Sequence, residues 1–443
     1  MSFYSVLENL LPAVKDPIKS PTIKQKLIWT GIILAVFFIL GTIGIIGISP
    51  STSSMLAYYQ MVMASQLGTI ITLGIGPIVL ASIILQLLVG VKLIDFDLSN
   101  PEDRAKFGIL QKFFSVILAV IEAIVSVAVG VLAPLPGMGL FVVIQAALGS
   151  ILLLYLDEVS TKYGIGSGIG LFIAAGVSQT IIWRLFSLPS AGNPGGLLFL
   201  TFEYIKTGAM MSLLSGVIIP LLVTFLVFLM VVYAEGMYVN IPLTVGQSGM
   251  GAKYPVKLLY VSNMPVILAA TLFANINLFV QLAKGSIFEN ILFKISALLT
   301  PKYQLIGETL LGGVTAGAWL NALIYLVIFV ITCVLFGKFW VQVGGQSSAE
   351  VAKQLQSSGM SIPGFRRDHR VLTTVLQRYI PTITILGSIF VALLAFLSDI
   401  VGAIGSGIGI LLTVGIIYRF YEQLAKDQMF ESSAFMKQIV GKK

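Results

Sequence analysis

Charged side chains are scarce in this sequence. Asp, Glu, Lys and Arg together make up 10% of its 443 residues, whereas 57% are hydrophobic and the mean hydropathy is +0.98. A water-soluble domain cannot cover its surface with so few charges, but a protein that crosses a membrane many times can. The composition therefore excludes an ordinary soluble protein and predicts a polytopic membrane protein.

Cysteine and histidine are almost missing, with one of each, Cys333 and His369. A single cysteine excludes a disulfide within the chain, and a metal site built from Cys and His is not expected. The sequence also has no HExxH motif and no serine or cysteine that pairs with a histidine base. We therefore expect neither an enzyme nor a bound metal or cofactor.

Apolar stretches long enough to cross a membrane occur ten times. A spanning helix needs about 20 mostly apolar residues. Glu122 is the one carboxylate within these stretches, whereas catalysis or proton coupling inside a membrane needs ionisable groups there. The predicted spans are 28–48, 69–89, 113–131, 140–156, 167–183, 210–233, 258–280, 317–340, 380–398 and 404–418.

Lys and Arg are distributed unequally between the connections. When the connections are assigned to alternate sides of the membrane, 22 of the 27 Lys and Arg fall on one side. Cationic residues concentrate on the cytoplasmic side of a membrane, so both termini are predicted to be cytoplasmic. The first 14 residues lack the apolar core of a signal peptide and predict a short amphipathic helix on the membrane surface. The cations on the external side are Arg184, Lys206, Lys284, Lys294 and Lys302.

One glycine-rich motif occurs twice. Residues 165–176 read IGSGIGLFIAAG and residues 404–415 read IGSGIGILLTVG, so that the first six residues are identical. The motif does not fit the G-x-G-x-x-G pattern of a dinucleotide-binding loop in any register. It opens the fifth and the tenth span, which predicts two five-helix halves of opposite orientation and a functional site near the membrane midplane. Close helix packing through small residues, or chance similarity between apolar sequences, are the alternatives.

The second span and the segment before it are irregular. Pro77 cannot donate an amide hydrogen, and Gly74 and Gly76 weaken the same turn, so we expect a bend in this helix. Residues 49–67, SPSTSSMLAYYQMVMASQL, carry no charge. Their composition fits a re-entrant segment inside a protein cavity and an amphipathic helix on the membrane surface equally well.

Aliphatic side chains accompany the glycines of these irregular helices. A pore narrowed by such side chains would exclude water and ions by dewetting. Because aliphatic side chains make no directional bonds, the narrow point could widen and close again, which suits a large and chemically varied substrate. The side chains concerned are Ile75, Val79, Ile169, Ile173, Ile408, Leu411 and Leu412.

The connection at residues 341–379 is long and basic. Ser347 and Glu350 form a capping-box pattern, which predicts a short surface helix that ends at Ser358. A dense cation cluster, GFRRDHR at residues 364–370, follows. The cluster is typical of an anchor against anionic lipid, and it also fits a docking site for a polyanion such as ribosomal RNA.

Four long stretches, spread along the chain, carry a specific resemblance. They are ITLGIGPIVLASIILQLL (71–88), YLDEVSTKYGIGSGIGLFIAAGVSQT (155–180), YPVKLLYVSNMPVILAATLFANI (254–276) and GIGILLTVGIIYRFYEQL (407–424). These stretches resemble the SecY family, whose members form the protein-conducting channel, and the likeness is to its archaeal and eukaryotic branch. The resemblance implies an all-α polytopic membrane protein with ten transmembrane helices in two inverted five-helix halves around a central pore. It also implies that unfolded polypeptides cross through this pore and that transmembrane segments leave sideways into lipid.

The resemblance further implies roles for particular residues of this sequence. A ring of six aliphatic side chains that seals the pore falls at Ile75, Val79, Ile169, Ile173, Ile267 and Leu412. A plug that closes the outer funnel falls at about 49–67, with Ser51, Met55, Tyr58, Tyr59 and Met63. The lateral gate for signal sequences includes Glu122, Asn275 and Leu80, the last at a position that is usually Ser or Thr in the family. Ribosome docking falls on Lys253, Arg366, Arg367 and Arg370.

Partners and boundaries follow from the same resemblance. It implies a single-span SecE-like (gamma) subunit, a small beta-type subunit, the translating ribosome, the nascent polypeptide with its signal sequence, and the lipid bilayer of the cell membrane. We expect an N-terminal segment at 1–27, a first half at 28–183, an external hinge at 184–209, a second half at 210–418 and a cytoplasmic tail at 419–443. The second half includes cytoplasmic loops at 234–257 and 341–379.

Two other classes of protein fit part of the pattern. A secondary transporter of a small solute also uses inverted repeats and broken helices, but it needs a polar path and more intramembrane ionisable groups. An insertase or scaffold without a continuous pore is the third alternative.

Overall fold

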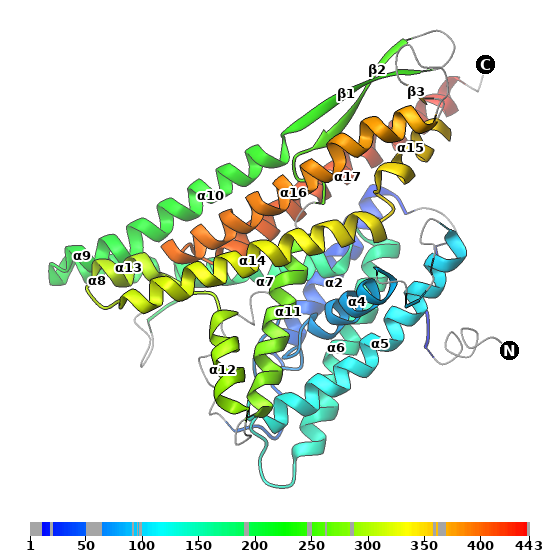
Figure 1. Cartoon of the computed structure of the whole chain (residues 1–443). Helices are drawn as coiled ribbons and strands as arrows, with labels where there is room; N and C mark the ends of the chain where they lie inside the picture. The colour runs from blue at the N-terminus through cyan, green and yellow to red at the C-terminus, as the bar shows by residue number, and fades with distance from the viewer. Residues whose placement is uncertain are drawn as a thin grey trace.

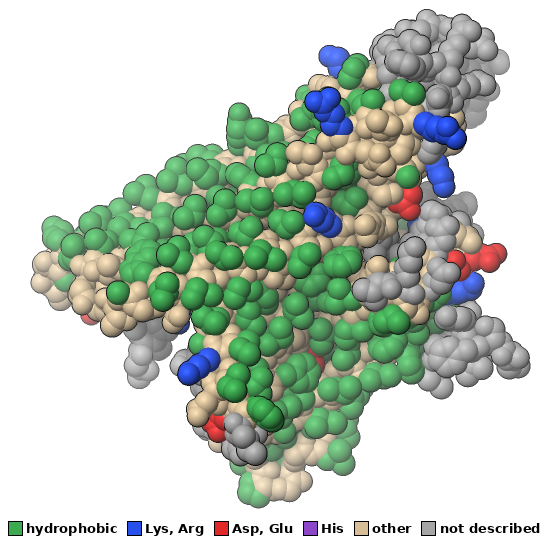
Figure 2. Space-filling model, viewed as in Figure 1, with side chains coloured by type: hydrophobic (Ala, Val, Ile, Leu, Met, Phe, Trp, Pro, Cys, Tyr) green, Lys and Arg blue, Asp and Glu red, His purple; other side chains and the backbone are tan. Residues whose placement is uncertain are grey.

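The computed structural model describes residues 11–17, 21–49, 64–90, 93–94, 96, 100–189, 195–245, 250–261, 264–283, 288–357, 360–361 and 369–440. Long helices dominate these residues, and a small sheet projects beyond them next to the ends of α16 (His369–Val401) and α17 (Gly407–Val440) (Figure 1). Hydrophobic side chains cover the visible long sides of the helices, whereas Lys and Arg gather mainly toward one end (Figure 2). This distribution is the one expected of a protein whose sides face lipid.

A helix lies on each of the ten predicted spans. Eight of these helices are long and apolar enough to cross a membrane, and the remaining two, α4 and α11, are shorter. The first half contains α2 (Ile23–Thr42), α4 (Gly76–Gly90), α5 (Pro101–Ala128), α6 (Gly139–Tyr163) and α7 (Gly168–Phe186). The second contains α9 (Met210–Leu213) continued by η2 (Leu214–Ile218) and α10 (Ile219–Glu235), then α11 (Met264–Val280), α14 (Ala316–Val343), α16 and α17.

Shorter elements connect the spans. On the connections predicted to be external these are α8 (Leu197–Thr207), η3 (Gln281–Ala283), α12 (Glu289–Leu298) and α13 (Leu305–Leu310). The predicted surface helix is present as α15 (Ser348–Ser357), and its capping box is formed in both directions between Ser347 and Glu350, at 3.4 and 3.3 Å. That prediction is confirmed to within one residue.

The predicted bend at Pro77 takes a different form. Pro77 lies in the first turn of α4, where its missing amide leaves no helical hydrogen bond unmade, and buried turns at residues 71–75 lead into the helix. Gly74 has a φ of +57°, a backbone conformation that glycine adopts without strain. Helix α4 is therefore short because it starts late, and it is not a long helix with a kink.

A small sheet was not predicted from the sequence. Strand β1 (Tyr238–Val245) pairs antiparallel with β2 (Met250–Lys257), with Tyr238 opposite Lys257, and β3 (Met360–Ser361) adds at the other edge of β1. The inward-facing Ile241 and Leu243 are buried in a cluster that includes residues of α15 and α16. Their alternation over two positions is the signal that the sequence carried for this strand.

Helices α7 and α17 show the inverted repeat directly, because they pack antiparallel with matched contacts. A Cβ added at Gly170 would lie 3.5 Å from Ile416, and one added at Gly409 would lie 3.1 Å from Val177. Positions 170 and 409 are repeat equivalents, as are 177 and 416, since residue 165 corresponds to residue 404. Each contact is thus the image of the other, which places a pseudo-twofold axis between the two helices.

Candidate functional site

The repeated glycines have specific backbone tasks at the start of α7 and α17. Gly166 and its equivalent Gly405 have φ values of +68° and +82°, a region that other residues enter only with strain. Gly168 and its equivalent Gly407 allow close helix approach, since a Cβ there would lie 2.5 Å from the Asp157 Cα and 2.4 Å from the Ala395 carbonyl oxygen. These glycines position the two helices against their neighbours.

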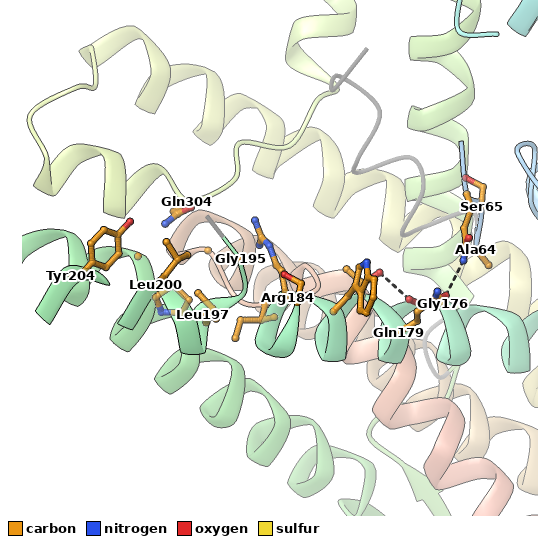
Figure 3. A pocket seen from close by; sticks show the side chains of 18 of the residues that line it. Ala64, Ser65, Gly176, Gln179, Arg184, Gly195, Leu197, Leu200, Tyr204 and Gln304 are labelled. Atoms are coloured by element: carbon orange, nitrogen blue, oxygen red, sulfur yellow. Dashed lines mark hydrogen bonds between the residues drawn. The ribbon is translucent and has the colours of Figure 1, made fainter. Parts of the chain in front are cut away.

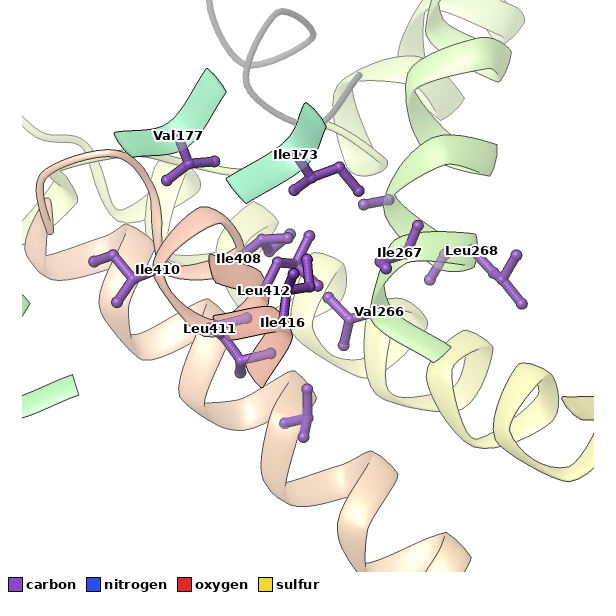
Figure 4. Packing of buried hydrophobic residues seen from close by; sticks show 14 of the residues in the cluster. Ile173, Val177, Val266, Ile267, Leu268, Ile408, Ile410, Leu411, Leu412 and Ile416 are labelled. Atoms are coloured by element: carbon purple, nitrogen blue, oxygen red, sulfur yellow. The ribbon is translucent and has the colours of Figure 1, made fainter. Parts of the chain in front are cut away.

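The six aliphatic side chains suggested as a pore ring lie in one hydrophobic cluster. Five of them are buried, and Ile169 is partly buried against the same cluster. They come from four helices or their first turns. Ile75 directly precedes α4 and Val79 lies in it, Ile169 and Ile173 lie on α7, Ile267 lies on α11, and Leu412 lies on α17. Ile173 on α7, Ile267 and Leu412 converge in Figure 4. The chain therefore brings together side chains that are up to 337 positions apart, from residue 75 to residue 412.

Four of these side chains form two pairs related by the inverted repeat. Ile173 corresponds to Leu412 through the repeated glycine motif. Val79 corresponds to Ile267, because PIVLA at 77–81 and PVILA at 265–269 occupy the first turns of α4 and α11. The closely packed centre of the molecule thus lies where the two halves present equivalent positions to each other.

Two cavities lie on either side of this cluster. One, of about 860 Å³, is lined by Val79, Ile169 and Ile267 and extends past Gly166 and Gln423. The other, of about 750 Å³, is lined along the opposite end of α7 by residues from Gly176 to Ser187 and by Gln66 and Gln304 (Figure 3). Ile173 lies between the two sets of α7 residues. The molecule is hollow toward both ends of α7 and tightly packed in between.

The lining of the second cavity is polar. The Gln66 side-chain amide donates to the Gln179 side-chain oxygen at 2.8 Å, which ties the described end of the 49–67 segment to α7. Ala64 and Ser65 line the same cavity and are buried. The suggested plug residues Ser51, Met55, Tyr58, Tyr59 and Met63 lie outside the described residues.

The suggested lateral-gate residues lie on three neighbouring helices, α4, α5 and α11. Leu80 packs with Leu118 of α5 and Phe279 of α11 in one small cluster. Glu122 and Asn275 are fully or almost fully buried, at 0% and 2% exposure, and the Asn275 amide donates to the Thr271 carbonyl at 3.0 Å. The helices are in contact here, so the described arrangement is closed toward the side.

The suggested docking cations are only partly within the described residues. Lys253 is exposed on β2, and Arg370 is exposed in the first turn of α16. Arg366 and Arg367 lie outside the described residues. Since β3 and α15 both pack near β1 and α16, the basic connection 341–379 meets the loop 238–255 at the same end of the molecule (Figure 1). Lys253 is the one cation of that loop, whereas the resemblance leads us to expect several.

Two aspartates that the sequence analysis overlooked lie at the starts of α7 and α17. Asp157 Oδ1 accepts from the Ile169 amide at 2.8 Å, and Asp399 Oδ1 accepts from the Gly407 amide at 2.6 Å. Each lies one residue beyond a predicted span, at 156 and 398, so neither was counted within the membrane. No local pattern marks them as caps, because a capping residue normally adjoins its helix, whereas Asp157 and Asp399 lie on the preceding helices α6 and α16.

Comparison with known proteins decides the family. The family model SecY matches residues 69–421, well over half of the chain. The chain belongs to the SecY family. It is 43% identical to the protein translocase subunit SecY of Methanococcus vannielii, with 100% of both chains covered. It is 44% identical to that of Methanocaldococcus jannaschii, with 99% of both chains covered.

Solved structures of SecY-family channels have the same fold. A protein-conducting channel superposes with a TM-score of 0.83 at 42% identity, covering 97% of this chain and 98% of the other. A SecY structure described in terms of its plug domain gives 0.80 at 42% identity, covering 97% of each chain. Sec61 in the canine ribosome-channel complex gives 0.80 at 40% identity with 97% of each chain covered. As a SecY-family member, the chain is a multi-pass membrane protein with ten spans.

Proposed function

We propose that this SecY-family chain is the central subunit of a protein-conducting channel and that its apolar waist is the functional centre. The observation that carries the proposal is the packing of Ile75, Val79, Ile169, Ile173, Ile267 and Leu412 between two cavities of about 750 and 860 Å³. Unfolded polypeptides pass through this waist, and transmembrane segments leave sideways. The channel is passive, because a narrow aliphatic passage has no groups that could hold or move a proton.

The six aliphatic side chains act as a seal in the resting state. Water and ions are excluded from a constriction lined only by aliphatic groups. Water would lose hydrogen bonds there, and an ion would lose its hydration shell, and the aliphatic side chains offer no polar groups in exchange. A translocating chain displaces these side chains without breaking hydrogen bonds, and they close around it. The same physics works for any substrate sequence, which a channel for varied polypeptides requires.

The segment 49–67 acts as the plug of the channel, on the side of the cavity of about 750 Å³, which we take as the outer cavity. Its described end, Ala64 to Gln66, already lines that cavity and is held to α7 by the Gln66–Gln179 hydrogen bond. A solved structure of a SecY relative is described by a plug domain that stabilises the closed state of its channel. The uncharged composition of the segment suits a position within the protein rather than in water.

The lateral gate lies between α4 and α11, and α5 packs beside α4. Leu80, Leu118 and Phe279 form its apolar contact, and Glu122 and Asn275 are its buried polar members. Parting of these helices would expose the pore to lipid, and an apolar segment of the substrate would then partition into the bilayer. Leu80 makes this gate more apolar than the usual Ser or Thr would.

The remaining assignments concern orientation and partners. Both termini lie in the cytoplasm, because 22 of the 27 Lys and Arg fall on that side. The hinge at 184–209 joins the halves 28–183 and 210–418 on the external side. The basic connection with Arg366, Arg367 and Arg370, together with Lys253, docks the ribosome, as a relative does in the canine ribosome-channel complex. SecE-like and beta-type subunits complete the channel, and the driving force comes from such partners and not from catalysis by this chain.

A secondary transporter of a small solute is the alternative from another class. The family membership favours the channel, and so does the apolar waist. Photo-crosslinking distinguishes the two. A photoreactive amino acid at Ile75 or Ile267 should crosslink to a stalled translocating polypeptide, whereas one at the exposed Leu222 of α10 should not. Equal crosslinking from Leu222 and from the two waist positions would contradict a path through the waist.

A further inference from the structure

The starts of α7 and α17 are held by carboxylates from the preceding helices. Asp157 on α6 accepts hydrogen bonds at Oδ1 from the Ile169 amide at 2.8 Å and from the Ser167 hydroxyl at 3.2 Å. Asp399 on α16 accepts at Oδ1 from the Gly407 amide at 2.6 Å. The first amides of a helix lack partners within it, and a negative charge near them is stabilised by the helix dipole. Both carboxylates therefore act as caps supplied by a neighbouring helix.

The two caps occupy corresponding places in the inverted repeat. Gly407 corresponds to Gly168, the residue directly before the Ile169 donor. At both positions the absence of a side chain permits the close approach, since a Cβ would lie 2.5 Å from the Asp157 Cα and 2.4 Å from the Ser398 Cβ. Because the halves are inverted, one cap lies toward each end of the α7–α17 pair. The aspartates themselves are not repeat equivalents, since Asp157 corresponds to Phe396 and Asp399 to Ser160. The two halves therefore share the place of the cap, at the glycine motif, and supply its carboxylate from different positions of the preceding helix.

Capping the start of the helix does not by itself explain why a carboxylate is buried at this place. In α17 the Ser406 hydroxyl already accepts from the Gly409 amide at 3.0 Å, so a local cap is present. Asp399 is 3% exposed, and burying a carboxylate is costly unless strong hydrogen bonds compensate. What the aspartate adds is a bond between helices, which fixes the height and rotation of α17 relative to α16, and of α7 relative to α6.

The fixed helices carry the waist of the pore. The Ile169 amide is itself a donor to Asp157, and Ile173 follows one turn later. Leu412 lies five residues after Gly407, which at 1.5 Å per residue is about 7.5 Å along the helix. Since Ile173 and Leu412 are repeat equivalents beside the pseudo-twofold axis, a shift of either helix would separate them. We propose that Asp157 and Asp399 are positioning residues of the pore seal, an inference that rests on the proposed role of the aliphatic waist.

Ion leak through the resting channel in reconstituted vesicles tests this proposal. Asp157→Ala and Asp399→Ala remove the acceptor, whereas Asp157→Asn and Asp399→Asn keep an oxygen that can accept. The Ala variants should leak about tenfold more than the unmodified channel, the change that corresponds to losing a cap of about 1.4 kcal/mol, and the Asn variants should leak much less. Glu158→Gln is the matched control, because Glu158 pairs with Lys112 and Lys162 and accepts from the Val14 amide, none of which belongs to α7, and its leak should be unchanged.

Further arms separate positioning from a general loss of stability. Folded protein of each variant is selected by size-exclusion chromatography. Its ion leak and its thermal stability are then both measured and compared. Ala variants that melt earlier but leak no more than the control, or Asn variants that leak as much as the Ala variants, would overturn the proposal. The double variant Asp157→Ala with Ile173→Gly should leak less than independent effects predict, because both act on one seal. If Asp399→Ala fails to fold, the half-buried Asp157 provides the same comparison.

The outcome for Leu412→Gly distinguishes the two proposals. If Leu412→Gly leaks and the folded aspartate variants do not, the cap inference fails while the aliphatic seal stands. If Leu412→Gly and the aspartate variants are all tight, the sealing role of the waist fails, and the positioning role fails with it.

Discussion

The Arg184 guanidinium donates a hydrogen bond to the Tyr303 hydroxyl, with 2.7 Å between Nη1 and the oxygen, and this bond joins the end of α7 to the second half. The Tyr303 hydroxyl in turn donates to the Ala403 carbonyl at 2.6 Å, just before the glycine motif of α17. Burial raises the pKa of the Tyr303 hydroxyl above its ordinary value, so the hydroxyl keeps its proton. The two halves are therefore connected beside the outer cavity through one tyrosine.

Replacing Tyr303 by Phe should loosen this connection. The substitution leaves the Ala403 carbonyl and Arg184 without their shared partner, and we expect a loss of about 1–2 kcal/mol in the free energy of unfolding. Thermal unfolding of the purified complex measures it. Tyr204→Phe is the control, because it removes a tyrosine hydroxyl from the lining of the cavity that Arg184 also lines. Equal effects of the two variants would contradict a role in joining the halves.

The sequence carried the helices and the inverted repeat, because both depend on patterns that are visible along the chain. Long apolar runs and the distribution of Lys and Arg placed ten spans, and the repeated IGSGIG motif indicated the inversion. The strand at Ile241 and Leu243 was missed, since a short alternation within a polar connection is a weak signal.

The aspartate caps could not be found by counting apolar residues. Asp157 and Asp399 lie where a span ends, and only the fold brings each of them to the start of the next helix. Ile267 entered the waist through family resemblance, because nothing in its local sequence shows that it packs with α7 and α17. The match of Val79 to Ile267 became visible only when α4 and α11 were seen to begin alike.

Removing an aliphatic side chain from the waist should open a path for ions. Ile173→Gly or Leu412→Gly should raise the resting ion conductance of reconstituted channels several-fold, because a gap at the waist admits water. Ile33→Ala is the matched control, since Ile33 is equally buried in the same cluster but lies on α2. It should lower stability by about 2–5 kcal/mol, as a buried cavity does, without raising conductance. Equal conductance of all three variants and the unmodified channel would argue against a seal.

Deleting residues 51–63 should destabilise the closed state. The segment would fill the outer cavity beside Gln66 and Gln179, so its loss should increase the frequency of brief channel openings in planar bilayers. A variant with a Gly/Ser segment of the same length separates the loss of the plug from a change in loop length. A surface helix predicts unchanged conductance for both variants, and that result would favour the amphipathic alternative.

Reversing charge at Arg366 and Arg367 should weaken ribosome binding. Cations that bind ribosomal RNA do so mainly through phosphate charge, so two Glu substitutions should lower affinity at least about tenfold at moderate salt. The difference should shrink as salt concentration rises, because screening weakens the lost attraction. Lys353→Glu on the neighbouring α15 is the control, since Lys353 is exposed at the same end of the molecule.

Cosedimentation of reconstituted channels with ribosomes measures affinity, and vesicles of neutral and anionic lipid show whether the same cations bind the membrane. If ribosome binding is unaltered and only the preference for anionic lipid is lost, this connection is a membrane anchor and the ribosome docks elsewhere.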